Sequence, residues 1–219
     1  MARKQRADAH RSRAAILDAA ARILNEQPEA SVETIATEAG VTRQTVYAHF
    51  PSREQLLVAV LDRLTELTVA AMDAADPDEG PAEEALLRVF DATARESERY
   101  PILLQRISAL PVSALEDHGR HAPITDRIER VIRRGQDTGE FDVHLPADWL
   151  ATVAIHLAHI AAHERNTDRM TAPDAHRAFT TSLMRILAPA TDPHQETPAP
   201  RAVRETPDPI APHAPPTRP

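Results

Sequence analysis

Three consecutive residues, Arg43, Gln44 and Thr45, carry side chains that can read the edges of DNA bases. An arginine guanidinium pairs in bidentate fashion with guanine, a glutamine amide pairs with adenine, and a threonine offers its hydroxyl or methyl group to thymine. Thr42, just before them, can cap a short helix, so all three would lie on the first helical turn. That turn is the part of a recognition helix that meets base edges. The spacing therefore favours a base-reading helix over residues 42–50.

Side chains that suit phosphate oxygens follow on the same segment. Tyr47 and His49 both offer hydrogen-bond donors. The backbone amides of helices that begin near Ser31 and Ser52 can supply further donors. Tyr47 can alternatively belong to the core of a small domain, because its ring is apolar and only its hydroxyl needs a partner. We assign Phe50 to that core.

The helices that must position these residues are short and closely spaced. An apolar stripe at helical spacing predicts a first helix of about four turns, through Ile16, Ala19, Ala20, Ile23 and Leu24. Ser31 is a good N-cap for a second helix, which Gly40 ends after about two turns. Thr42 begins a third helix and Pro51 stops it. The pattern predicts a helix-turn-helix over residues 31–50, although an ordinary pair of helices with a glycine turn looks similar.

The composition favours helices throughout the chain. Apolar residues make up 42% of the 219 residues and glycines number only 5, while alanine and leucine, both strong helix formers, are abundant. Further stripes predict a long helix from Ser52 to Ala75 and several more after it, nine helices in all and no strand. The predicted fold class is all-α. Gly119 and Pro123 predict a break in the chain, with His118 and His121 in a solvated loop.

The charge is distributed unevenly along the chain. The net charge is −8, yet residues 1–25 contain six arginine or lysine residues against two aspartates. A basic end on an acidic body is compatible with a nucleic-acid partner, and also with a solvated basic arm. After Ala188 prolines become frequent and large apolar residues rare, so we expect a disordered tail over 189–219. A proline-rich docking segment is the alternative interpretation of this tail.

Several classes of protein are disfavoured by what the sequence lacks. There is no cysteine, hence no disulfide framework, and no apolar run of about 20 residues, so we expect a cytoplasmic protein that does not span a membrane. A Gly-rich phosphate loop, a Gly-x-Ser-x-Gly elbow and a His-Glu-x-x-His motif are all absent, so we expect no enzyme activity and no cofactor. His156, His159 and His163 share one helix face, but without further ligands we predict a polar interface face rather than a metal site.

Two runs of the sequence resemble the tetracycline-repressor (TetR) family of bacterial regulators. They are Ile16–Ala20, ILDAA, and Ser31–Leu57, SVETIATEAGVTRQTVYAHFPSREQLL. The resemblance covers residues 12–60 and implies contacts to bases or phosphates from these residues: Thr42, Arg43, Gln44, Thr45, Tyr47, His49 and Arg53. Among them Tyr47, His49 and Arg53 would meet phosphates. Glu33 departs from relatives that carry a basic or polar DNA contact near this position, so no contact is assigned to it.

The same resemblance implies how the chain is divided and how it assembles. Residues 1–50, with a basic arm over 1–11, would bind DNA, and residues 51–188 would form a helical domain that binds an effector and dimerises. The dimer would form through helices near 147–164 and 173–188, with Leu157, His159, Phe179 and Leu183 at the interface. A two-fold dimer would require a palindromic or nearly palindromic double-stranded operator. Repression is the expected outcome, and activation stays open.

An effector pocket is expected inside the larger domain. Aromatic residues are only 3% of the chain, so the walls would be mostly aliphatic and the effector a small apolar molecule. The predicted lining residues are Leu86, Val89, Phe90, Tyr100, Leu103, Leu104, Ile107, Ile128, Ile132 and Trp149. The alternative is a closed, fully packed core in a regulator that has no ligand.

Overall fold

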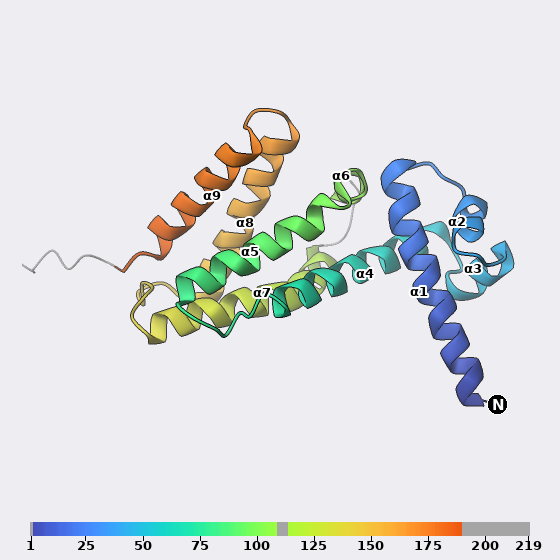
Figure 1. The fold of residues 1–219 in the computed structure, drawn as a ribbon, viewed down its shortest axis with the longest axis horizontal. Helices are drawn as coiled ribbons and strands as arrows, with labels where there is room; N and C mark the ends of the chain where they lie inside the picture. The colour runs from blue at the N-terminus through green and yellow to red at the C-terminus, as the bar shows by residue number, and fades with distance from the viewer. Residues whose placement is uncertain (1, 109–113, 190–219) are drawn as a thin grey trace, which may run out of the picture. The chain divides into compact units, whose positions relative to one another are not determined.

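The computed structural model describes residues 2–108 and 114–189, with the side chains of 7–104, 119 and 121–189. Over these residues the chain forms helices and no strand, which confirms the predicted all-α fold (Figure 1). The helices are α1 (Ala2–Glu26), α2 (Val32–Glu38), α3 (Arg43–His49), α4 (Arg53–Asp73), α5 (Ala82–Glu98), α6 (Pro101–Ser108), α7 (Ala114–Asp137), α8 (Ala147–Asn166) and α9 (Ala172–Leu187). None of the helices described here is long and apolar enough to cross a membrane. The predicted tail, beyond Pro189, lies outside the described residues.

Helix α1 begins at Ala2, so residues 2–11 of the predicted basic arm belong to the first helix. Residues 2–26 contain neither glycine nor proline and consist largely of strong helix formers. The helix therefore extends well upstream of the apolar stripe that predicted it. Arg11 pairs with Asp8 one turn earlier, on this exposed part of the helix.

The short helices α2 and α3 are held by the caps that the sequence predicts. The Ser31 hydroxyl accepts a hydrogen bond from the Thr34 amide at 3.1 Å, and the Thr42 hydroxyl accepts one from the Thr45 amide at 3.1 Å. Gly40, between the two helices, has φ +66°, a backbone conformation that glycine adopts at little cost. These local signals produce the predicted helix-turn-helix.

Helices α1 to α4 share one apolar core, to which α6 also contributes. Its larger members include Ile16, Leu24, Ile35, Val46, Phe50, Leu56, Val60 and Leu103. The assignment of Phe50 to the core is thus confirmed. The Asn25 side-chain oxygen at the end of α1 accepts hydrogen bonds from the Ile102 and Leu103 amides, at 3.0 and 3.2 Å. A side chain of α1 thereby caps the first turn of α6.

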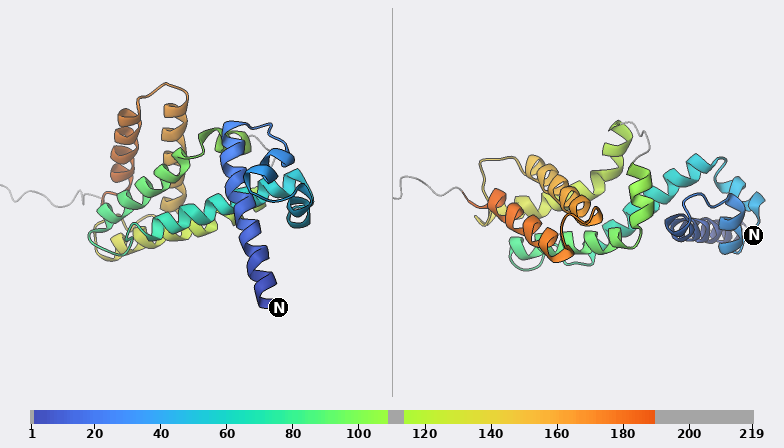
Figure 2. Two further views of the ribbon diagram at one scale, coloured as in Figure 1. Left: turned by 45° about the vertical axis from the view of Figure 1, so that its right-hand side comes forward. Right: turned by 90° about the horizontal axis from the view of Figure 1, so that it is seen from above.

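A second apolar core lies among the end of α4 and helices α5, α7, α8 and α9. Its members include Met72, Leu86, Ile128, Ile132, Leu150, Leu183 and Leu187. The Phe90 and Phe179 rings meet edge to face, with centroids 5.0 Å apart, and so join α5 to α9. Helices α8 and α9 lie side by side and antiparallel (Figures 1 and 2).

Helix α4 takes part in both cores. Leu56, Val60 and Leu64 belong to the first and Met72 to the second. The first core therefore extends past residue 50, where the sequence suggested a domain boundary. At the far end of α4 the Asp73 carboxylate accepts two hydrogen bonds from the Arg127 guanidinium, at 2.6 and 2.8 Å, which ties α4 to α7.

The predicted break at Gly119–Pro123 is wrong, since α7 runs through both residues, and His118 and His121 lie within the helix. Proline removes one backbone hydrogen bond but does not forbid a helix whose other face is well packed. The residues of α7 that come after Pro123 supply this packing, because Ile128, Val131 and Ile132 are buried in the second core.

Candidate nucleic-acid interface

The first turn of α3 presents polar side chains on a rigid base. Arg43 and Gln44 are exposed and Thr45 is half-buried. Val46 is 1% exposed and anchors the helix in the first core. The hydroxyl groups of Thr42 and Thr45 lie 2.8 Å apart and form a hydrogen bond. Backbone and cap thus fix α3 while its exposed side stays available to a partner.

Arg43 lies in a cluster with two neighbours. Its guanidinium carbon is 5.4 Å from the centroid of the Tyr47 ring, one turn along α3. Its Nη1 atom lies 3.8 Å from Oε2 of Glu33, which belongs to the first turn of α2. Interaction with the Tyr47 hydroxyl and, to a smaller degree, with the Glu33 carboxylate raises the pKa of Arg43 above its ordinary value. The guanidinium is therefore held from both helices of the motif.

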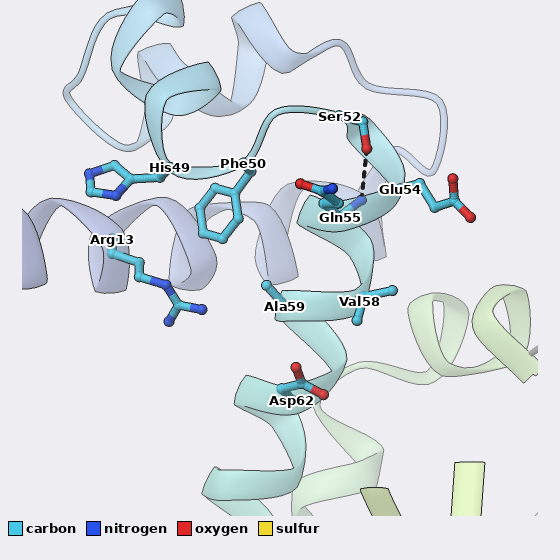
Figure 3. A pocket seen from close by; sticks show the side chains of 9 residues that line it. All are labelled: Arg13, His49, Phe50, Ser52, Glu54, Gln55, Val58, Ala59 and Asp62. Atoms are coloured by element: carbon cyan, nitrogen blue, oxygen red, sulfur yellow. Dashed lines mark hydrogen bonds between the residues drawn. The ribbon is translucent and has the colours of Figure 1, made fainter. Parts of the chain in front are cut away.

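His49 lies at the edge of an open hollow where α1, the end of α3 and the start of α4 meet (Figure 3). Arg13 from α1 stands over the Phe50 ring, 5.4 Å from its centroid. Ser52, at the start of α4, accepts a hydrogen bond from the Gln55 amide at 3.1 Å and so caps this helix. The contact between Arg13 and Phe50 could not be predicted from sequence, because the two residues lie 37 positions apart in the chain.

Arg53 has partners within the protein. Its guanidinium is partly buried and donates to the backbone carbonyls of Ala30 and, at 2.9 Å, Pro28. It therefore holds the α1–α2 loop against the start of α4. The phosphate contact implied by the family resemblance stays a prediction, and the structure adds a stabilising role that the sequence did not suggest.

The residues predicted to line an effector pocket divide between the two cores. Leu86, Phe90 and Ile128 are buried in the second core, whereas Tyr100 and Leu104 pack against the first. Trp149 is 57% exposed on α8 and does not line the interior of the chain, contrary to the prediction. The side chain of Ile107 lies outside the described residues. None of the predicted lining residues borders the hollow of Figure 3.

The residues predicted to form the dimer interface do not all lie on the surface of the chain. Leu183 is 1% exposed and packs in the second core, so its assignment to a dimer interface is wrong. The apolar stripe of α9 faces its own chain, as the contact between Phe179 and Phe90 also shows. Leu157 is half-buried and His159 is exposed on α8. Their place at an interface stays a prediction.

The exposed face of α8 carries two large apolar side chains among polar ones. Trp149 and Ile160 are 57% and 58% exposed, and their spacing of three helical turns places them on one side of the helix. His156 lies on the same side, with its Nδ1 atom 2.8 Å from the Thr152 carbonyl oxygen. Among the residues that the structure describes, no group of three potential ligands is arranged to hold a metal ion.

Comparison with known proteins places the chain in a family. Residues 16–60 match the family model described as bacterial regulatory proteins, tetR family. The chain is 31% identical over 166 residues to the HTH-type transcriptional regulator TtgR of Pseudomonas putida, an alignment that covers 67% of this chain and 78% of TtgR. The chain belongs to the tetR family of bacterial transcription regulators. This confirms the resemblance seen in the sequence and the prediction of a regulator rather than an enzyme.

Other relatives extend the comparison. The HTH-type transcriptional repressor LfrR of Mycolicibacterium smegmatis is 44% identical over 82 residues, which are 37% of this chain and 43% of LfrR. The alignments with the first two curated relatives span less than half of those proteins, 43% and 47%. The crystal structure of LfrR with proflavine superimposes with a TM-score of 0.57 at 28% identity, covering 81% of this chain and 97% of that one. A regulator from Rhodococcus sp. shares the fold alone, with a TM-score of 0.70 at 22% identity over 82% of this chain and all of that one.

Proposed function

We propose that the protein is a dimeric repressor that binds a palindromic operator through α3 and releases it when a small molecule binds the helical domain. The observation that carries the proposal is the first turn of α3. Arg43 and Gln44 are exposed there on a helix that Thr42 caps and Val46 anchors. A partner with base edges in a groove matches these donors and acceptors.

The dimer is supported by the exposed face of α8. Exposed apolar side chains that gather on one face can mark a surface that another chain covers. Trp149 and Ile160 are such residues, and half-buried Leu157 lies between them along the helix. A second copy of the chain would bury this face, and binding to two half-sites one turn of DNA apart would require the two α3 helices to lie about 34–36 Å apart.

Arg43→Ala is expected to weaken operator binding by about 1–3 kcal/mol and to relax the preference at one base position, because a bidentate base contact is lost. His49→Ala is expected to weaken operator and random DNA more evenly, because a side chain that meets phosphate carries no sequence information. The operator is first selected from a pool of random duplexes, and affinities are then measured on single-base variants of it. Wild-type protein that selects no sequence would contradict the proposed function. An equal loss of base preference in both variants would contradict the division of roles.

Release by an effector is tested with two measurements on one set of compounds. Apolar aliphatic compounds fit the composition of the second core, and the proflavine complex of LfrR makes planar aromatic compounds the comparison set. An effector is expected to raise the melting temperature and to weaken the operator, and by linkage the operator must weaken the effector by the same factor. Compounds that stabilise the protein but leave operator affinity unchanged would contradict release and leave DNA binding intact.

A further inference from the structure

Glu33 is an acidic residue beside the side chain that is proposed to read bases. Its carboxylate lies on the first turn of α2, 3.8 Å from Arg43, and the two side chains are 73% and 58% exposed. An exposed ion pair of this kind contributes little to folding stability. A negative charge beside a DNA-reading helix also opposes binding to a polyanion. The pair therefore has more consequence for DNA binding than for the fold.

The geometry leaves part of the Arg43 guanidinium free for a base. Glu33 approaches Nη1, while the Tyr47 ring lies against the guanidinium from α3. An arginine has five donor hydrogens in a fixed fork, so one edge can pair with a carboxylate while another pairs with guanine. A guanidinium that turns away to a phosphate would instead leave the Glu33 carboxylate unpaired and close to the DNA backbone.

Resting on the DNA-binding function proposed above, we propose that Glu33 is a specificity-determining residue, which holds Arg43 for guanine and penalises its use as a phosphate anchor. Specificity is a difference between two affinities, and it increases when the wrong complex contains an unpaired or repelled charge. Random DNA always offers Arg43 phosphates but seldom a guanine in register with the other contacts, so Glu33 weakens that complex most. The operator complex keeps the pair and loses less.

Glu33→Gln tests the proposal, because it removes the charge and keeps the size of the side chain. The full chain is titrated with the selected operator and with a scrambled duplex of equal length and composition, over a range of salt concentrations. The affinity for the scrambled duplex is expected to rise by about 3–10-fold and the operator affinity by less than about 2-fold. The slope of log affinity against log salt on scrambled DNA should steepen by about 0.9, as one added phosphate contact requires.

Two matched variants separate this role from a general charge effect. Glu38→Gln removes another exposed carboxylate of α2, one that pairs with Arg22 of α1 at 2.8 Å, and it should leave the ratio of the two affinities unchanged. In an Arg43→Gln background, Glu33→Gln should no longer change that ratio. Equal effects of Glu33→Gln and Glu38→Gln would overturn the proposal.

Three further outcomes have distinct meanings. A Glu33→Gln variant that loses operator affinity and keeps its affinity for scrambled DNA would also overturn the proposal, because Glu33 would then contact a base itself. Wild-type protein that binds neither duplex would overturn the proposed function and this inference with it. Wild-type binding with an unchanged ratio in Glu33→Gln overturns this inference alone.

Discussion

Leu183→Glu is expected to unfold the helices around the second core rather than to release folded monomers. Leu183 is 1% exposed among apolar side chains, so the new carboxylate would be buried without a partner. An uncompensated buried charge costs about 3–5 kcal/mol, and the lost leucine packing adds to it. That is a large part of the usual folding stability of about 5–15 kcal/mol. Circular dichroism during thermal melting should show a much lower midpoint or no cooperative transition.

Ile160→Glu on α8 is the matched control for this change. Its side chain is 58% exposed, so a carboxylate there stays hydrated in the single chain and costs little folding stability. We expect folded monomers in sedimentation experiments and weak operator binding, because the charge would be buried only in the proposed dimer. Folded monomers of Leu183→Glu would contradict the placement of Leu183, and stable dimers of Ile160→Glu would contradict the α8 interface.

Gly135→Ala is expected to destabilise the protein by about 1–3 kcal/mol, the usual cost of forcing an added methyl group into a packed core. A Cβ atom at Gly135 would lie 2.1 Å from Cδ2 of the Phe141 ring, which is itself 3% exposed. The ring has little room to withdraw, because it is buried in the second core and the Phe141 amide donates to the Gly135 carbonyl at 3.0 Å, which holds the backbone in place. The free energy of unfolding, measured in urea, should fall accordingly.

Gly119→Ala provides the opposite result on the same helix. Gly119 is exposed in α7 and an added Cβ would meet nothing within 4 Å. Alanine at an exposed helical position is favoured over glycine by about 1 kcal/mol, so this variant should be more stable than wild type. Two variants that change stability in the same direction and by the same amount would contradict the role given to the Phe141 ring.

The helix-turn-helix could be predicted from sequence because its signals are local. Ser31, Thr42 and Ser52 each bond to an amide three residues ahead, and Gly40 provides the turn between α2 and α3. The residue types that produce these features lie within a few positions of one another. The exposed first turn of α3 follows from the same short segment.

What the sequence could not supply is which surface each side chain meets. An apolar stripe shows that Leu183 and Trp149 belong to helices with an apolar face, yet one is buried in its own chain and the other exposed. The bonds from Arg53 to the Pro28 and Ala30 carbonyls could not be predicted, because these residues lie more than 20 positions away in the sequence. The apolar stripe does not predict the full length of α1, because the residues upstream of Ile16 are helical through their propensity and carry no such stripe.

The cap that Asn25 places on α6 ties the helices of the helix-turn-helix region to the helices that follow. A fragment of residues 51–189 alone, without α1 to α3, would leave the Ile102 and Leu103 amides without their acceptor. It would also uncover Leu56 and Val60, which pack against the helices removed. Such a fragment would expose a contiguous apolar surface and be prone to aggregate. A chimera that exchanges the helix-turn-helix between relatives would therefore also have to include the start of α4 and the contact between α1 and α6.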